Sequence, residues 1–360
     1  MEINFIVHTF DKRDKGGVLR VISELANVLS QRDQLTINVF SLGNITELAF
    51  PLSNKINVIS LGLIEYNTQF YSSYKKIKWF KDANDVLQEH IKRNEHSIWI
   101  TSSPPLTLLF SIYKLFFKIK VIGCDHTSTV YKKNYFFEFL RVFLLRKLNV
   151  IVSLTKEDAS YYNSKSIRSV YIPNGIDFNK ISEIDNKRKY VIFVGRLSVE
   201  KRPFKAIELF INSKLYIEGR KFLMYGDGEL KTKLSTYIKN EKLDSSVELI
   251  TNVTDLDLLY KDAYALLLTS SIEGFGMVLL EAMSRGIPCI AVDCPYGPRN
   301  IIQNGLNGFL ISDDIVNIDH EFINIKNLDK QLIVDSVRKF DLKEVEKKWF
   351  LLISEVFNES

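Results

Sequence analysis

Residues 265–286 read ALLLTSSIEGFGMVLLEAMSRG, and they are the clearest guide to the architecture. The first four residues are all apolar, which is typical of a strand buried on both faces in the middle of a parallel sheet. Polar residues with two glycines, Gly274 and Gly276, come next, and a second apolar run then has the length of a helix. A strand that leads through a loop into a helix is the repeating unit of an α/β fold.

The same alternation of short apolar strands and helices continues along the chain; residues 191–194, Val-Ile-Phe-Val, form another strand of this buried kind. We expect strands at residues 2–7, 36–40, 97–101, 120–124, 150–153, 169–172, 190–194, 222–225, 247–250, 265–269, 289–292 and 308–311. Helices are expected near residues 17–31, 76–94, 104–116, 134–147, 155–163, 203–214, 228–241, 255–263, 277–285, 298–303 and 342–357.

The number of strands points to two domains, because one twisted sheet rarely takes so many. We predict an α/β fold with two Rossmann-like, doubly wound parallel-sheet domains that face a cleft, where ligands bind at the carboxyl ends of the strands. The turn-forming run from Pro173 to Gly175 sets the boundary. The expected domains are residues 1–172 and 173–341, and residues 342–360 form a helix that packs across the junction onto the first domain.

Composition excludes several classes of protein. Of 360 residues, 46% are hydrophobic and 25% are charged, which fits folded domains and excludes a disordered or collagen-like chain. Three cysteines are too few for a disulfide framework, so we expect a reducing compartment. The first residues lack the basic region of a signal peptide, and no stretch reaches the roughly 18 uncharged apolar residues of a spanning helix.

The charge is uneven along the chain. Residues 1–170 hold 23 of the 48 Lys+Arg and 15 of the 43 Asp+Glu, a net +8, so the remaining 25 and 28 give −3. Lysines and aromatic residues also alternate at 70–81 and 131–147, a pattern that fits either a helix at an anionic membrane surface or a core helix with lysines at its edge. Nucleic acid is disfavoured because no nucleic-acid-binding motif is present.

The segment after residue 269 combines features of an anion site. Free N–H groups at the start of the predicted helix suit a diphosphate. Glu281 stands alone in that apolar helix, and a buried carboxylate needs a partner such as the hydroxyls of a ribose. Glu273, before the helix, points to the same site. The alternative is that Glu273 caps the helix and Glu281 lies at the surface.

Two cations follow the strand at residues 190–194. Arg196 comes after Gly195, and Lys201 precedes a helix opened by Pro203. Cations at a strand-to-helix turn can neutralise a diphosphate leaving group, although loop cations are often simply solvated.

Two further loops carry candidate residues in the first domain. Gly16 and Gly17 stand between the first strand and the first helix, where adjacent glycines suit contact with a phosphate or form a flexible turn. The arrangement is not a dinucleotide fingerprint, since G-x-G-x-x-G is absent.

His126 follows the strand at 120–124 and can either bond a sugar or have a structural role. A zinc site is disfavoured, because the cysteines and this histidine show no standard ligand spacing.

Glu273 and Glu281, with seven residues between them after an apolar strand, resemble the E-x7-E motif of the retaining nucleotide-sugar glycosyltransferases with the GT-B fold, glycosyltransferase family 4 (group 1). The resemblance is clear over about residues 170–311. It implies that Glu273 meets the donor sugar, Glu281 holds the ribose, and Arg196 and Lys201 replace a metal ion, so no metal or other cofactor is expected. The implied catalytic residues are Glu273, His126, Arg196 and Lys201, and the implied donor-binding residues are Gly16, Gly17, Arg196, Lys201, Asn252, Val253, Glu273, Gly274, Phe275, Gly276, Met277, Val278 and Glu281.

The resemblance implies a retaining, metal-independent hexosyltransferase that uses a nucleotide-sugar, most often a UDP-sugar. The acceptor is expected to be a glycan or a lipid-linked glycan in bacterial surface polysaccharide synthesis (lipopolysaccharide, O-antigen or capsule). The expected location is cytoplasmic, with a peripheral contact on the inner face of the membrane. Two alternatives remain open: a non-catalytic sugar-nucleotide-binding subunit of a glycan assembly complex, or an epimerase or phosphorylase of the same fold.

Overall fold

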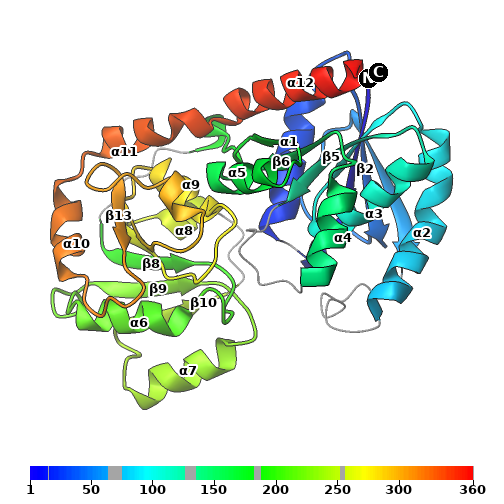
Figure 1. The fold of residues 1–360 in the computed structure, drawn as a ribbon. Helices are drawn as coiled ribbons and strands as arrows, with labels where there is room; N and C mark the ends of the chain where they lie inside the picture. The colour runs from blue at the N-terminus through cyan, green and yellow to red at the C-terminus, as the bar shows by residue number, and fades with distance from the viewer. Residues whose placement is uncertain (15, 64–74, 126–134, 182–187, 252–255, 360) are drawn as a thin grey trace. The chain divides into compact units, whose positions relative to one another are not determined.

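The computed structural model describes residues 1–14, 16–63, 75–125, 135–181, 188–251 and 256–359. They fall into two compact units (Figure 1). Unit 1 comprises Met1–Gly175 and Leu342–Ser360, and unit 2 comprises Ile176–Asp341. Each unit is built on its own parallel sheet.

Unit 1 contains a seven-stranded parallel sheet in the order β3-β2-β1-β4-β5-β6-β7. The chain builds outward from β1 to β3 and then returns to add β4 on the other side of β1, so the strand order reverses between β1 and β4. This reversal is the point where ligands bind in open α/β sheets. The strands are β1 (Glu2–Val7), β2 (Thr36–Gly43), β3 (Ile56–Leu63), β4 (Ile98–Thr101), β5 (Lys120–Asp125), β6 (Val150–Ser153) and β7 (Ser169–Tyr171).

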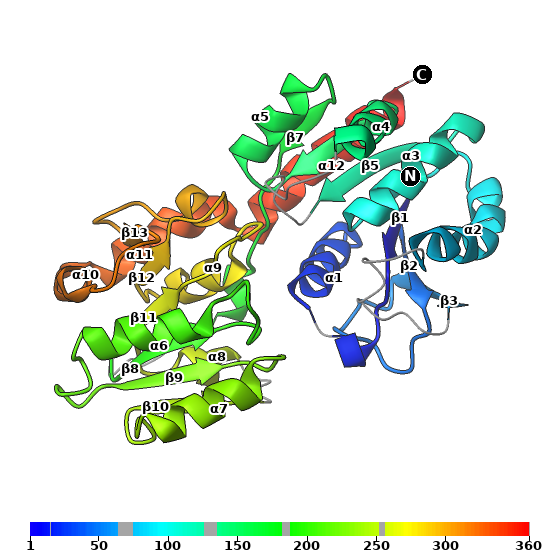
Figure 2. The same ribbon diagram turned by 60° about the horizontal axis from the view of Figure 1, so that its bottom comes forward.

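Helices cover both faces of this sheet, and α1 and α2 lie on opposite sides of β1 and β2 (Figure 2). One core joins α1 to α12 through residues such as Leu25 and Trp349, and the other joins the sheet to α2 and α3 through residues such as Leu87 and Phe110. The C-terminal helix α12 therefore belongs to unit 1. The helices are α1 (Gly17–Leu29), α2 (Lys75–Arg93), α3 (Pro104–Phe116), α4 (Tyr135–Leu145), α5 (Lys156–Ser164) and α12 (Leu342–Asn358).

Unit 2 contains a six-stranded parallel sheet in the order β10-β9-β8-β11-β12-β13, which reverses between β8 and β11. One core packs α6, α7 and α10 against the sheet, while α8 and α9 lie on its other side (Figure 1). The strands are β8 (Tyr190–Val194), β9 (Lys221–Tyr225), β10 (Val247–Ile250), β11 (Ala263–Leu268), β12 (Cys289–Val292) and β13 (Gly308–Ile311); the helices are α6 (Pro203–Asn212), α7 (Lys231–Asn240), α8 (Leu256–Tyr260), α9 (Met277–Met283), α10 (Asp319–Asn324) and α11 (Lys330–Val337).

The predicted fold class is confirmed: two parallel α/β sheets, with the C-terminal helix packed on the first helix of the chain. Four details differ. The sequence missed β3, α10 and α11, and the helix expected at 298–303 is a single 3-10 turn, Pro298–Asn300. In the described parts of the chain, every helix is too short or too polar to cross a membrane.

Candidate functional site

The candidate site of unit 2 lies where its strand order reverses. Strands β8 and β11 are parallel neighbours, with Val191 opposite Ala265 and Ile192 opposite Leu266. Their carboxyl ends therefore lie side by side. The loop after β8 carries Arg196 and Lys201, and the loop after β11 carries Glu273.

The structure brings Lys201 and Glu273 together. The Lys201 ammonium donates to Oε1 of Glu273, which also accepts a hydrogen bond from the Ser270 hydroxyl at 2.7 Å. Glu273 is 7% exposed, and the lysine side chain is 29% exposed. A buried carboxylate requires such partners, so the two predicted residues form one ion pair at the edge of the sheet.

Further hydrogen bonds tie the two loops to each other. The Thr269 hydroxyl donates to the carbonyls of Lys201 and Arg202, both at 3.0 Å, and the Ser271 amide donates to the Glu200 carbonyl at 2.8 Å. Arg202 also donates from its Nε to the Thr269 carbonyl at 2.8 Å. These links fix where Lys201 lies relative to Glu273, because they join the backbones on both sides of the ion pair.

Glycines shape the start of α9. Gly276 has φ 97° and caps the helix, a conformation that side chains with a Cβ rarely adopt. Phe275 faces inward and stacks edge-on against Phe340 at 5.6 Å, so it can offer only its backbone to a ligand. Amides in the first turn of a helix have no partner within the helix. In α9 these include the amides of Met277 and Val278.

Glu281 is buried on α9, with 5% exposure, so the surface alternative for this residue is wrong. The Tyr260 hydroxyl, from α8, donates to Oε2 of Glu281 at 2.8 Å. Burial, followed by the negative charge of Glu281, raises the pKa of Tyr260 well above its usual range. The other alternative, Glu273 as a helix cap, is also wrong, because Gly276 holds that position.

Arg196 reaches outward from the end of β8. Its side chain is 69% exposed, and its Nε lies 3.8 Å from Oε2 of Glu229. Two loops meet closely beside it, since a Cβ on Gly226 would lie 1.9 Å from the Gly195 carbonyl oxygen. The backbone just before Arg196 is therefore closely packed against the loop of Gly226, while the charged side chain of Arg196 faces solvent.

Among the remaining predicted residues that the structure describes, Gly274 lies at this site and the two glycines of unit 1 lie elsewhere. Gly16 caps α1 in unit 1 and Gly17 opens that helix; a Cβ on either would meet nothing within 4 Å, so packing does not require glycine at these positions. His126, Asn252 and Val253 lie outside the described residues. Gly274 stands in the loop between Glu273 and α9.

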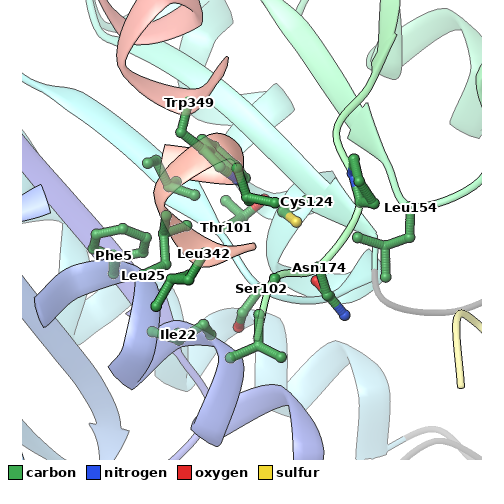
Figure 3. Close-up of a pocket in the computed structure, with 15 residues that line it drawn as sticks. Phe5, Ile22, Leu25, Thr101, Ser102, Cys124, Leu154, Asn174, Leu342 and Trp349 are labelled. Carbon is green, nitrogen blue, oxygen red and sulfur yellow. The ribbon is translucent and has the colours of Figure 1, made fainter. Parts of the chain in front are cut away.

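Unit 1 has a pocket beside the carboxyl ends of β1, β4 and β5 (Figure 3). It encloses a cavity of about 20 Å³, room for one water molecule rather than a sugar. Ser102 and Asn174 supply polar groups, and α12 closes it with Leu342 and Trp349. The cavity is therefore a packing feature of unit 1.

Within the parts of the chain that the structure describes, no group of three or more His, Cys, Asp or Glu side chains is placed to hold a metal ion.

Comparison with known proteins matches part of the chain to a sequence family. Residues 176–327 match the sequence model of the family "Glycosyl transferases group 1". Over this segment, which lies within unit 2, the chain is similar to the group 1 glycosyltransferases, family 4 with the GT-B fold. The matched segment contains Arg196, Lys201, Glu273 and Glu281.

Individual relatives extend the similarity to nearly the whole chain. A Campylobacter jejuni GalNAc-α-(1→4)-GalNAc-α-(1→3)-diNAcBac-PP-undecaprenol α-1,4-N-acetyl-D-galactosaminyltransferase is 26% identical and covers 99% of both chains. The amylovoran biosynthesis glycosyltransferase AmsD of Erwinia amylovora is 28% identical over 83% of this chain and 82% of its own. A solved structure of an S. aureus TarM variant, in complex with fondaparinux, α-GlcNAc-glycerol and UDP, has a TM-score of 0.76 at 14% identity, covering 99% of this chain and 100% of its own.

Sequence reasoning missed three residues of this site. Ser270 and Arg202 stand next to predicted features, and the polar pair Thr269-Ser270 directly after a buried strand was an available signal. Tyr260 had no such signal, because its contact with Glu281 joins two residues that are 21 positions apart and lie on different helices.

Proposed function

We propose that this chain is a retaining group 1 glycosyltransferase that transfers a hexose or a hexose derivative from a UDP-sugar to a glycan or lipid-linked acceptor in the synthesis of a bacterial surface polysaccharide. The observation that carries the proposal is the contact of Lys201 with Glu273 at the switch point of unit 2. The helix that follows this loop, α9, carries the buried Glu281. The UDP in the TarM complex and the undecaprenol-linked acceptor in the name of the Campylobacter relative support the substrate classes.

The residues of unit 2 have distinct proposed roles. Glu281 accepts hydrogen bonds from the ribose hydroxyls, and Glu273 accepts one from the donor sugar. Lys201 and Arg196 neutralise the diphosphate as its bond to the sugar breaks, because leaving-group charge grows in the transition state. Backbone amides from Gly274 to Val278 contribute to the same anion site. With these cations in place, the proposed reaction does not need a metal ion.

The proposed transfer takes place on one face of the sugar. The acceptor hydroxyl attacks the anomeric carbon as the bond to the UDP oxygen breaks, and its proton passes to the leaving phosphate. We propose that unit 1 holds the acceptor, and that Gly16, Gly17 and His126 contribute to donor or acceptor contacts. Asn252 and Val253 would meet the nucleotide base.

We also propose that the glycosyltransferase acts in the cytoplasm at the inner face of the membrane. No disulfide joins its three cysteines, all in described parts of the chain, which fits a reducing compartment. Unit 1 exposes an apolar surface on α3 and α4, here named the α3–α4 surface: Leu115, Phe116, Phe139, Leu140 and Phe143. Lys147 lies 5.3 Å from the Phe143 ring, and Lys118 is exposed next to α3. Apolar side chains with cations at their edge suit an anionic lipid surface.

A panel of nucleotide-sugars tests the proposal. The purified protein is heated with UDP-GlcNAc, UDP-GalNAc, UDP-glucose, UDP-galactose and GDP-mannose, and UDP release is then followed with and without a lipid-linked glycan. We expect one UDP-sugar to raise the melting temperature, since a ligand at 100 times its Kd adds about 2.7 kcal/mol. Acceptor-dependent release of UDP supports a transferase. Donor binding without any turnover would favour the non-catalytic subunit, and no stabilisation by any UDP-sugar would contradict the proposed donor class.

A further inference from the structure

Both carboxylates of the E-x7-E pair accept a hydrogen bond from a hydroxyl that is itself inaccessible to solvent. The Tyr260 hydroxyl donates to Oε2 of Glu281 at 2.8 Å, and the Ser270 hydroxyl donates to Oε1 of Glu273 at 2.7 Å. Tyr260 and Ser270 are both 0% exposed. Neither residue is part of the motif, and neither side chain is exposed to solvent.

The tyrosine is fixed from several sides. The Arg285 guanidinium lies 5.1 Å from the centre of the Tyr260 ring and donates to Oδ1 of Asp257 at 2.6 Å. It also donates to the backbone carbonyl of Glu281 at 3.0 Å. Asp257 and Tyr260 belong to α8, and Arg285 follows α9. The phenol is thus held by one network that joins the two helices, so its hydroxyl points at Oε2 in a defined direction.

The serine is fixed by the strand before it. Ser270 follows Thr269, whose hydroxyl bonds the carbonyls of Lys201 and Arg202 at 3.0 Å. The carbonyl of Ser270 accepts from Arg202 at 3.4 Å. Ser270 and Lys201 therefore approach the same oxygen of Glu273 from two loops that are bonded to each other.

We propose that Tyr260 and Ser270 are positioning residues that orient Glu281 and Glu273, respectively, toward the nucleotide-sugar. The proposal rests on the function assigned to the two carboxylates above. A carboxylate offers about four acceptor sites. One hydrogen bond from a buried hydroxyl can therefore fix the orientation of the carboxylate and still leave sites that accept from ligand hydroxyls. Fixing this orientation in advance lowers the conformational entropy that is lost on binding. Tyr260 acts through Glu281 on the ribose, and Ser270 acts through Glu273 on the donor sugar.

This difference gives a split that a purely structural role would not produce. Tyr260→Phe keeps the ring and its contact with Arg285 but releases Glu281, so the Kd for UDP and for the UDP-sugar should rise by a similar factor, roughly 10-fold, with kcat little changed. Ser270→Ala releases Glu273, so the Kd for UDP should stay within about twofold while kcat with the UDP-sugar falls roughly 10-fold. Ser270→Thr, which keeps a hydroxyl, should recover part of that loss.

Matched controls separate orientation from loss of stability. Tyr264→Phe removes another inaccessible phenol, which donates to the Phe322 carbonyl at 2.6 Å. Ser284→Ala removes a buried hydroxyl that donates to the backbone carbonyl of Glu281 at 3.0 Å. Both are expected to lower the melting temperature by amounts like those of the test variants, without moving the Kd for UDP or kcat.

Calorimetric titration with UDP and with the UDP-sugar decides the matter, together with the double variant Tyr260→Phe/Glu281→Gln. If Tyr260 acts through Glu281, the double variant binds UDP about as weakly as Glu281→Gln alone. The positioning role would be overturned if the losses of UDP affinity in the two single variants add fully in the double variant. It would also be overturned if the control variants weaken UDP binding as much as Tyr260→Phe does. If Glu281→Gln alone binds UDP like the wild type, the ribose assignment fails instead, and with it the site on which this proposal rests.

Discussion

Glu273 and Lys201 lie 72 positions apart in the sequence, yet their side chains form an ion pair at the edge of the unit 2 sheet. The pair is almost closed to solvent on the carboxylate side and partly open on the lysine side. A diphosphate that approaches Lys201 would thus meet a cation whose position is already set by Glu273 and by the bonds of the loop around it.

We predict that Lys201→Ala and Arg196→Ala lower kcat more than they weaken donor binding, because leaving-group charge grows in the transition state. Each lost charge-assisted contact is worth about 1.5–3 kcal/mol, or roughly 10- to 150-fold in rate. Arg196→Lys should also lose activity, since lysine lacks the planar fork. Steady-state kinetics and titration with UDP check this, and full activity in both alanine variants would remove the diphosphate assignment.

His8 makes a second prediction at this scale, on pH. It follows β1, accepts or donates a bond with the Ser103 hydroxyl at 2.6 Å, and packs against Trp79. Burial lowers its pKa from 6.5 to about 3. Below pH 6.5 the unfolded chain therefore binds a proton at His8, whereas the folded protein does so only near pH 3. As a result, the free energy of unfolding falls as pH drops from 6.5 toward 3.

Between pH 6.5 and pH 5 this one group is expected to remove about 1–2 kcal/mol from the free energy of unfolding. Urea unfolding of the wild type and of His8→Gln over that range measures it. The variant should show the shallower dependence on pH, and parallel curves would mean that His8 does not titrate in this way.

Among the elements, α12 is the one whose docking the structure explains most directly. Arg32, just after α1, donates to both carboxylate oxygens of Glu346 on α12, with Nη2 at 3.1 Å from Oε2, and its guanidinium lies 3.8 Å from the Phe350 ring centre. Glu346 is 7% exposed, so removal of its partner leaves a nearly buried charge.

We therefore predict that Arg32→Ala lowers the free energy of unfolding of unit 1 by about 2–4 kcal/mol, toward the range for a broken buried pair. Arg168→Ala is the control, because Arg168 also bonds α12, at Glu355, but its side chain is 39% exposed. An exposed pair contributes about 0–1 kcal/mol. Denaturation curves that shift equally for the two variants would contradict the larger loss of stability that we predict for the more buried pair.

The elements also show what the sequence could predict and what it could not. Strands with every residue buried, such as β11 and β12, were predictable because a short uninterrupted apolar run between turn residues is typical of the middle of a parallel sheet. Strand β3 was missed because it is an edge strand, where only Ile56 is buried and polar residues alternate with apolar ones. The pairing of Lys201 with Glu273 and of Tyr260 with Glu281 depends on which strands and helices become neighbours, and local pattern does not contain that information.

At the scale of the whole molecule, residues 1–170 carry a net charge of +8, and two of their lysines lie at the α3–α4 surface. Phe116 and Phe139, at 76% and 75% exposure, are the most exposed members of the α3–α4 surface, and Lys118 and Lys147 stand beside it. Large aromatic side chains in water are costly, and burial of one in a lipid interface recovers about 1.5–3 kcal/mol.

We predict that the protein binds vesicles rich in phosphatidylglycerol, and that salt weakens the binding. Phe139→Ser and Lys147→Glu should each reduce the bound fraction in a flotation assay. For Lys147→Glu, the free energy of binding should weaken by about 1 kcal/mol or more. Ile217→Ser, which removes an apolar side chain of 69% exposure from unit 2, should not. Equal flotation with neutral and anionic vesicles would rule out this role for the α3–α4 surface.

The central claim is that the buried carboxylate of α9 holds the ribose of a nucleotide-sugar, and calorimetric titration of Glu281→Gln with UDP tests it most directly. The substitution keeps the shape of the side chain but replaces a charged acceptor with a neutral one, so UDP affinity should fall by about 1–2 kcal/mol. A 2′-deoxy-UDP should bind the wild type more weakly than UDP and lose little further in the variant. If the variant binds UDP and 2′-deoxy-UDP with the wild-type affinities, Glu281 is a structural residue and this account of the site is wrong.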